Sequence, residues 1–334
     1  MTRLRLGLIG AGRISGSYAD VLGDCESVEV VGVADVATEA ASALANRLGS
    51  ASYTSHLELA EDARPDAVVI CTPPNTHAGI SLELVARGIH VMCEKPLALS
   101  PAEAVKMLAA ADENGVTLTM ASKFRYVQDV VKARSIVMSG VLGEIILLEN
   151  TFASRVDMAS RWNSKSDVSG GGVLIDNGTH SVDVVRYFLG PIAEVMAVEG
   201  KRAQALSVED TAQLFLRGVD GARATIDLSW SIDKERPWYL EVYGSEGTIQ
   251  VGWGSSRYRQ RTSSDWVEFG SGYDKTQAMH DQIANFARAI AGEEPLRITG
   301  VDALASVDVM EAAYRSLSHD NWAEVESSRS LAPA

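Results

Sequence analysis

The sequence has no continuous run of about 18 apolar residues, the length that a helix needs to cross a bilayer. Hydrophobic residues make up 46% of the chain and charged residues 22%, and there are only 9 prolines. This composition is typical of a globular α/β protein and unlike that of a fibrous or low-complexity chain. We therefore expect a globular protein that does not associate with membranes.

Basic residues are too few to create a positive field. The chain has 30 Lys and Arg against 44 Asp and Glu, a formal net charge of −14. No cluster of Lys and Arg is long enough to neutralise a run of phosphates, as nucleic-acid binding requires. We expect no nucleic-acid partner.

Cysteine is also scarce, with Cys25, Cys71 and Cys93 the only three. Their odd number, apolar surroundings and lack of a CxxC spacing argue against a disulfide framework or a zinc site. We expect no metal centre and a reducing, cytoplasmic environment.

The length of 334 residues suggests two domains, which we place at residues 1–122 and 123–334. In the first, short apolar runs alternate with helical patterns. The runs predict strands at Leu6–Ile9, Val28–Ala34, Ala67–Thr72, His90–Cys93 and Thr117–Met120. Strands buried on both faces and joined by crossover helices form a parallel sheet, so we predict a doubly wound Rossmann domain in an α/β protein.

The second domain is predicted to be α+β. Helices are expected near Val127–Ser139 and Gly172–Leu189, and again at Thr276–Ala291 and Val301–Leu317. Between them, residues 193–269 alternate apolar and polar positions, which indicates a large, mostly antiparallel open sheet. Its second face must be covered, so we expect a homodimer or homotetramer.

A glycine-rich turn, Gly10-Ala11-Gly12-Arg13-Ile14-Ser15, follows the first predicted strand and opens a helix. In this context G-x-G-x-x-G binds a dinucleotide, although such turns also occur without nucleotides. Ser15 replaces the third glycine, which normally lets the helix pack on the strand. We predict that Gly10, Gly12, Arg13 and Ile14 bind the cofactor.

Asp35 ends the second predicted strand, near the offset of about 20 residues expected for a ribose-binding carboxylate. It could also be a simple strand-end Asp. A carboxylate there would bind ribose hydroxyls and repel a 2′-phosphate, and Val36 and Ala37 supply no Arg to bind one. The position therefore favours NAD over NADP.

Two further motifs carry acid–base and electrostatic chemistry. Lys95 follows a predicted strand at the carboxyl edge of the sheet, where ligands of α/β folds bind, although it could be an ordinary surface lysine. Asp176 and His180 lie four residues apart in a predicted helix, hence on one face, with Asp183 on the same side. They could be a common Asp–His surface pair, but buried-looking neighbours favour a functional one. We predict that Lys95, Asp176 and His180 are catalytic, and that all three contact the substrate.

Together these motifs resemble the Gfo/Idh/MocA family of oxidoreductases. The resemblance covers nearly the whole chain and rests on residues 10–15, on Cys71-Thr72-Pro73-Pro74-Asn75-Thr76-His77, on Glu94-Lys95-Pro96 and on residues 170–180. It implies a Rossmann domain and an open-sheet domain that often mediates oligomerisation. It further implies that Arg125 approaches the nicotinamide and Trp162 the substrate. The cofactor contacts expected beyond the glycine-rich turn and Asp35 are Thr72, Pro73, His77, Glu94, Lys95 and Arg125.

The predicted activity is hydride transfer between NAD and a secondary hydroxyl or ketone of a sugar, amino-sugar precursor or cyclitol. Three alternatives stay open: an NAD-assisted glycoside hydrolase of the same family, a noncatalytic NAD-binding sensor and a purely structural partner.

Overall fold

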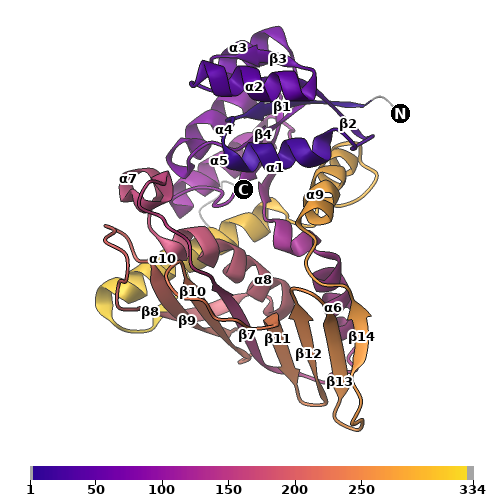
Figure 1. Cartoon of the computed structure of the whole chain (residues 1–334), viewed down its shortest axis with the longest axis vertical. Helices are drawn as coiled ribbons and strands as arrows, with labels where there is room; N and C mark the ends of the chain where they lie inside the picture. Colours follow the sequence, from indigo (N-terminus) through magenta and orange to yellow (C-terminus); the bar gives the residue numbers. More distant parts are fainter. Residues whose placement is uncertain (1–2, 329–334) are drawn as a thin grey trace. The chain divides into compact units, whose positions relative to one another are not determined.

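The computed structural model describes residues 3–328 and divides the chain into two compact units (Figure 1). Among the described residues, the first unit contains 3–123, 275–304 and 328, and the second contains 124–274 and 305–327. The first segment of the first unit ends at Lys123, next to the boundary expected after residue 122. Residues 275–304, which we placed in the second domain, belong to the first unit.

The first unit is built on a six-stranded parallel sheet in the order β3-β2-β1-β4-β5-β6. Its strands are β1 Leu4–Ile9, β2 Val28–Ala34, β3 Ala51–Tyr53, β4 Ala67–Ile70, β5 His90–Glu94 and β6 Leu118–Ala121. The helices are α1 Arg13–Leu22, α2 Thr38–Leu48, α3 His56–Asp62, α4 His77–Val85, α5 Pro101–Glu113 and α9 Lys275–Ile290, with a 3-10 turn at Pro74–Thr76. This order confirms the predicted Rossmann sheet. The short strand β3 was not predicted.

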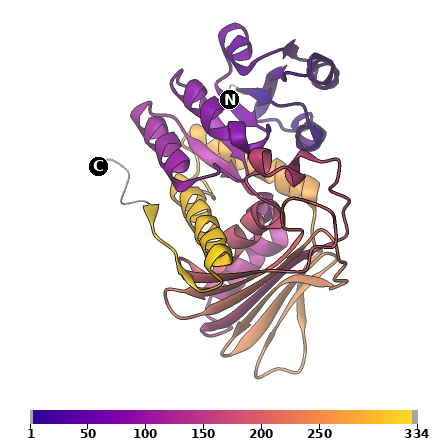
Figure 2. The ribbon, with the colours of Figure 1, turned by 90° about the vertical axis from the view of Figure 1, so that its left-hand side faces the viewer.

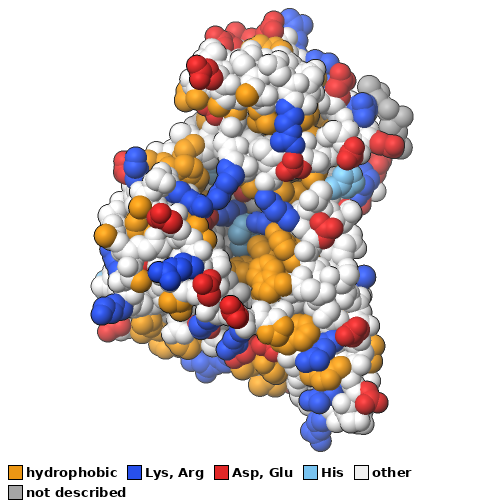
Figure 3. All heavy atoms as spheres, in the orientation of Figure 1, with side chains coloured by type: hydrophobic (Ala, Val, Ile, Leu, Met, Phe, Trp, Pro, Cys, Tyr) orange, Lys and Arg blue, Asp and Glu red, His pale blue; other side chains and the backbone are white. Residues whose placement is uncertain are grey.

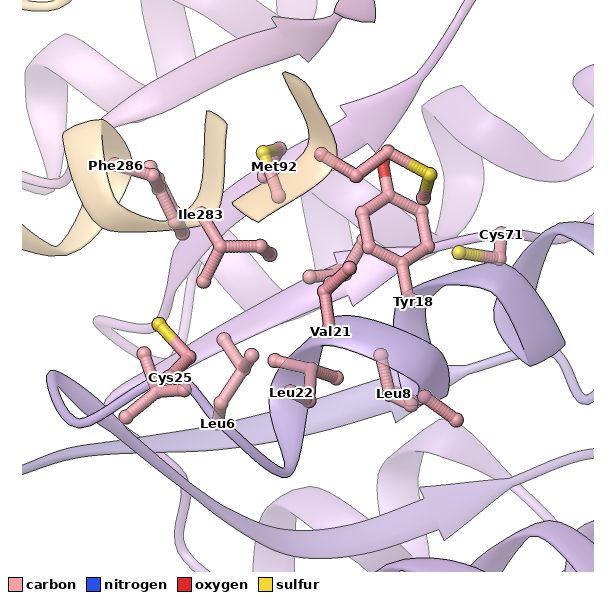
Figure 4. Close-up of a cluster of buried hydrophobic side chains, with 14 of the residues drawn as sticks. Leu6, Leu8, Tyr18, Val21, Leu22, Cys25, Cys71, Met92, Ile283 and Phe286 are labelled. Atoms are coloured by element: carbon pink, nitrogen blue, oxygen red, sulfur yellow. The ribbon is translucent and has the colours of Figure 1, made fainter. Parts of the chain in front are cut away.

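Helix α9 packs against helix α1, although more than 250 residues separate the two in the sequence. Figure 4 shows Ile283 and Phe286 of α9 facing Val21 and Leu22 of α1. All four side chains are almost completely buried. The apolar stripe of α9 thus completes the hydrophobic core of the first unit.

The second unit is built on a nine-stranded sheet in the order β14-β13-β12-β11-β7-β10-β9-β8-β15. Its strands are β7 Ile145–Ala153, β8 Ile192–Glu199, β9 Thr211–Gly218, β10 Arg223–Ser229, β11 Trp238–Gly244, β12 Gly247–Gly252, β13 Ser256–Gln260, β14 Val267–Gly270 and β15 Ala323–Glu324. Only the β7–β10 pair is parallel, which confirms the mostly antiparallel sheet. Strand β7 lies inside this sheet and was not predicted.

Helices cover one face of this sheet, as Figure 2 shows in magenta and yellow. They are α6 Gln128–Met138, α8 Thr179–Leu189 and the later part of α10 Gly300–His319, while the short α7 Ser166–Ser169 and the 3-10 turns Lys123–Tyr126 and Trp162–Ser164 lie in connections. Strand β9 shows the resulting pattern: Leu214 and Leu216 are buried, and Phe215 between them is 38% exposed. The face without helices is therefore partly apolar.

The surface drawn in Figure 3 carries both acidic and basic side chains. Within residues 3–328, no helix is long and apolar enough to cross a membrane.

Candidate active site

The glycine-rich turn lies between β1 and α1, as the sequence predicted. Gly10 has φ of +96°, and a Cβ there would lie 2.9 Å from the carbonyl carbon of Cys71. A side chain is thus excluded both by the backbone conformation and by the neighbouring strand end. At Gly12, by contrast, an added Cβ would meet no atom within 4 Å. The backbone is tight at Gly10 and open at Gly12, which fits a turn that admits a pyrophosphate.

Helix α1 begins at Arg13 and Ile14, directly after this turn. Arg13 is exposed, whereas Ile14 packs partly against the hydrophobic core. Ser15, at the position of the missing glycine, is completely buried and donates a hydrogen bond of 2.6 Å to the carbonyl of Gly10. The serine hydroxyl therefore ties the helix to the turn, and the departure from the glycine pattern leaves the turn intact.

Asp35 ends β2 beside the same turn. One carboxylate oxygen accepts a hydrogen bond of 2.6 Å from the amide of Ala11, and the other accepts one of 2.7 Å from the amide of Ala37. The side chain is only partly buried, and each carboxylate oxygen has a second lone pair. Asp35 thus fits the expected contact with ribose hydroxyls.

Thr72, Pro73 and His77 follow β4 at the carboxyl edge of the sheet. The His77 ring is completely buried; Nδ1 lies 2.8 Å from the carbonyl oxygen of Pro96, and Nε2 lies 2.9 Å from that of Thr72. Burial lowers the pKa of His77, and a neutral ring donates to one of these oxygens at a time. His77 therefore braces the loops that follow β4 and β5, while its direct contact with a cofactor stays a prediction.

Glu94 and Lys95 lie at the end of β5. The Glu94 carboxylate accepts hydrogen bonds from the Tyr18 hydroxyl at 2.7 Å and from the Lys95 amide at 3.2 Å. Gln282 of α9 in turn donates to the Tyr18 oxygen at 2.9 Å. Burial raises the pKa of Glu94, and the charge of Lys95 and the Tyr18 hydrogen bond oppose that rise. Sequence reasoning did not identify Tyr18 and Gln282, because only the fold brings them to Glu94.

Asp176 and His180 belong to the second unit. Residues Leu174–Gly178 form a π-helical turn that runs directly into α8, where we predicted an ordinary helix. Such wider turns occur frequently at functional sites. His180 is 7% exposed, and its ring packs against that of Phe124 in a T-shaped arrangement with a centroid distance of 5.2 Å. Asp176 is more exposed and donates its amide to the carbonyl of Gly172.

Arg125 and Asp183 form a buried ion pair within the second unit. The guanidinium Nη2 lies 2.8 Å from Asp183 Oδ1, and the Tyr187 ring lies 5.1 Å from the guanidinium carbon. Asp183 is therefore the ion-pair partner of Arg125. It lies about one turn further along α8 than His180. Trp162, in its 3-10 turn, is 42% exposed and has an aromatic surface free to meet a ligand.

The predicted residues thus fall into two groups. Those predicted to bind the cofactor lie in the first unit at the carboxyl edge of the sheet, apart from Arg125. Those predicted to contact the substrate lie in the second unit, apart from Lys95. Throughout residues 3–328, no three His, Cys, Asp or Glu side chains are arranged to hold a metal ion.

Comparison with known proteins agrees with this arrangement. Residues 4–122 match a model described as the oxidoreductase family with an NAD-binding Rossmann fold, and residues 130–250 match the GFO/IDH/MocA C-terminal domain. Together the two models match well over half of the chain, in the expected order. The chain therefore belongs to the Gfo/Idh/MocA family of oxidoreductases, and its first unit is an NAD-binding domain.

Curated relatives align over almost the full length. The rhizopine catabolism protein MocA of Rhizobium meliloti is 29% identical, covering 96% of this chain and 97% of the relative. Inositol 2-dehydrogenase of the same organism is 28% identical over 94% and 97% of the two chains. Among solved structures, GenD2 from gentamicin A biosynthesis, in complex with NAD, has a TM-score of 0.87 and 28% identity, covering 98% and 97%.

Proposed function

We propose that this protein is an NAD-dependent dehydrogenase or reductase acting on a secondary hydroxyl or ketone of a sugar, amino-sugar precursor or cyclitol. One observation carries the proposal: a chain of this oxidoreductase family holds Lys95 directly after Glu94 at the end of β5, Asp176 on a π-helical turn, and His180 in the first turn of the helix α8 that follows. The similarity to an inositol 2-dehydrogenase supports the substrate class.

NAD, when bound, supplies the acceptor for the hydride that leaves the carbon bearing the hydroxyl. Gly10, Gly12 and Asp35 would hold it at the turn between β1 and α1. In the chain itself, His180 exchanges the hydroxyl proton, because an imidazole titrates near neutral pH and suits general acid–base catalysis. Asp176 orients that ring. The Lys95 ammonium donates a hydrogen bond to the substrate oxygen and stabilises negative charge that develops there.

We further propose that the protein acts in the cytoplasm as a homodimer or homotetramer. Its three cysteines are free and buried, which suits a reducing compartment. On the sheet face without helices, Phe215 is 38% exposed and Val198 of the neighbouring strand β8 is 40% exposed. A second copy of the chain would cover these apolar side chains through a two-fold contact.

The test is a substrate panel with the purified full-length protein and NAD, followed by NADH absorbance. The panel contains myo- and scyllo-inositol, common aldoses, sugar phosphates, nucleotide sugars and simple glycosides. We expect NADH to accumulate with a cyclitol or sugar and to require both Lys95 and His180.

Two other outcomes would overturn the proposal. Cleavage of a glycoside without net NADH accumulation would identify an NAD-assisted hydrolase. NAD binding without turnover of any panel member, unaffected by Lys95→Ala or His180→Ala, would identify a sensor.

A further inference from the structure

Two consecutive acidic residues, Glu209 and Asp210, directly precede strand β9. Both are buried, with exposed fractions of 6% and 0%. Burying two adjacent carboxyl groups is costly unless each finds hydrogen-bond donors. The donors come from three segments of the second unit: residues 172–174 and Tyr314 donate to Glu209, and residues 203–204 donate to Asp210.

Glu209 binds the start of the π-helical turn. Its Oε1 accepts hydrogen bonds from the amides of Gly172 at 2.8 Å and Leu174 at 3.1 Å, and from the Tyr314 hydroxyl at 2.9 Å. Its backbone carbonyl accepts the amide of Val173 at 2.9 Å. One residue therefore holds three successive amides, at a helix start where amides lack acceptors within the helix.

Glycine makes this approach possible. A Cβ at Gly172 would overlap the carbonyl oxygen of Glu209, and one at Gly171 would overlap the Tyr314 hydroxyl. The Gly172 carbonyl accepts the amide of Asp176, so the clamped segment leads directly to Asp176 and then to His180. The position of these two side chains thus depends on the contacts that Glu209 makes.

Asp210 binds a different loop. Its Oδ2 accepts the amides of Ala203 at 2.8 Å and Gln204 at 2.7 Å. The Gln204 side chain donates to the carbonyl of Val156 at 2.9 Å and accepts the amide of Met158 at 3.0 Å. Burial alone would raise the pKa of Asp210, but these amide hydrogen bonds lower it, so the group is held as a carboxylate.

The loop that Gln204 holds leads to Trp162. The turn Trp162–Ser164 is also contacted by Ser207, whose hydroxyl donates to the Ser164 carbonyl at 3.2 Å. Asp210 therefore acts, through Gln204, on the segment that presents the exposed indole.

We propose that Glu209 and Asp210 are positioning residues for the substrate side of the site: Glu209 sets the turn that presents Asp176 and His180, and Asp210 sets the loop that presents Trp162. This inference rests on the proposed function, which gives those three residues their roles. Because the two carboxylates act on different segments, their loss should have different kinetic consequences.

The experiment compares four variants of the full-length protein on the panel substrate with the highest turnover. Glu209→Met removes the acceptor, while Glu209→Gln keeps an oxygen that can accept the same hydrogen bonds. Asp210→Ala and Asp210→Asn form the corresponding pair. The Glu209 variants serve as controls for the Asp210 variants and the reverse, because both residues are buried acids next to each other in the chain but bind different segments. NAD binding is measured for all four, because the first unit should be unaffected.

For Glu209→Met we expect kcat to fall about 10–100-fold and the pH–rate profile to shift, since a displacement of about 1 Å costs about that much. For Asp210→Ala we expect KM to rise about tenfold with a smaller change in kcat. Glu209→Gln and Asp210→Asn should restore both constants to within a few-fold of the wild type. NAD affinity should stay within about twofold of the wild type in every variant.

Amide hydrogen exchange tests the contacts without any substrate. We expect faster exchange at the amides of Gly172 and Leu174 in Glu209→Met, and at those of Ala203 and Gln204 in Asp210→Ala. Each variant should leave the amides that the other affects unchanged. If Glu209→Met does not fold, Tyr314→Phe replaces it, and kcat should then fall several-fold with NAD binding intact.

Wild-type kinetics in Glu209→Met, or in Tyr314→Phe where it replaces that variant, would overturn the role of Glu209. Wild-type kinetics in Asp210→Ala would overturn that of Asp210. The substrate panel and His180→Ala separate the two hypotheses. If His180→Ala loses turnover while the Glu209 and Asp210 variants keep it, only the positioning roles are refuted. Full turnover in His180→Ala refutes the role assigned to His180 and, with it, the positioning role of Glu209, whereas a wild-type protein that produces no NADH with any panel member refutes the proposed function.

Discussion

Ser15 illustrates how a single side chain can replace a missing glycine. The pattern requires a small residue where helix α1 packs on strand β1, and serine is small enough to be completely buried there. Its hydroxyl satisfies the Gly10 carbonyl at 2.6 Å, so the polar atom is not left without a partner. Sequence reasoning identified the departure from the pattern, but the compensating hydrogen bond depends on a side-chain rotamer that no pattern specifies.

Asp35 should determine the choice between NAD and NADP. Asp35→Ala removes an acceptor for ribose hydroxyls and the charge that repels a 2′-phosphate. A hydrogen bond to a charged group contributes about 1.5–3 kcal/mol, so NAD should bind roughly 10–100-fold more weakly. NADP binding should weaken less. Titration of both cofactors measures this, with the exposed Asp24→Ala as control; tighter binding of NADP by the wild type would contradict the ribose assignment.

His180 and Lys95 should fail differently when replaced. His180→Ala should chiefly lower kcat, by about 10²–10⁴-fold, because it removes proton transfer. Lys95→Ala should also lower kcat/KM, because the ammonium both binds the oxygen and stabilises its charge. Asp176→Asn keeps the shape of its side chain and should shift the pH dependence of the rate. Steady-state kinetics across pH measures all three.

NAD affinity should change little in His180→Ala, which serves as the control for that variant. An unchanged pH profile in Asp176→Asn, together with near-normal turnover in His180→Ala, would move the proton-transfer role to Lys95 or to another group.

At the scale of elements, the sequence predicted the strands that have clear local signals on both sides. Strand β2 was predicted with its observed bounds, and β1, β4, β5 and β6 within two residues at each end, because their apolar runs lie between clear helix signals. Strand β3 has only three residues, too few to show a period. Strand β7 begins with four apolar residues, Ile145 to Leu148, and such a run does not distinguish a strand from a buried helix.

The π-helical turn at Leu174–Gly178 could not be predicted for a different reason. Its spacing of hydrophobic residues is that of a helix, and the sequence predicted a helix there. The acceptors for its first amides come from Glu209, 35 residues or more further along the chain. The geometry of this turn, which carries Asp176, therefore depends on tertiary contacts.

Helix α9 was predicted correctly as a helix but assigned by its place in the chain to the second domain. Its partner α1 is identified only by packing, through Phe286, which is 1% exposed. Phe286→Ala should lower the free energy of unfolding by about 3–5 kcal/mol, because it removes a buried ring and leaves a cavity. Urea unfolding measures the change.

Arg288→Ala, on the same helix, is the control for Phe286→Ala. Arg288 pairs with Glu294 at the surface, and loss of such a pair should cost at most about 1 kcal/mol. Equal stability of the two variants would show that α9 does not contribute to the core of the first unit.

At the scale of the whole molecule, the two units divide the chemistry of the family between them. The parallel sheet of the first unit collects strand ends at one edge, so residues far apart in sequence, such as Asp35 and Lys95, follow strands that end at the same edge. In the second unit, the residues proposed to contact the substrate lie in a connection, in the π-helical turn and at the start of α8; they are Trp162, Asp176 and His180. That sheet has helices on one face, and this asymmetry leads to the prediction for the assembled protein.

We expect light scattering after size-exclusion chromatography to show a dimer or tetramer at micromolar concentration. Phe215→Glu should shift the protein toward the monomer, because it places a charge near exposed Val198 on the face without helices. The control is Val219→Glu, which makes the same kind of change at a 69% exposed apolar residue outside the regular strands. NAD binding should persist in both variants. A monomeric wild type, or equal assembly of the two variants, would show that this face does not form the contact between subunits.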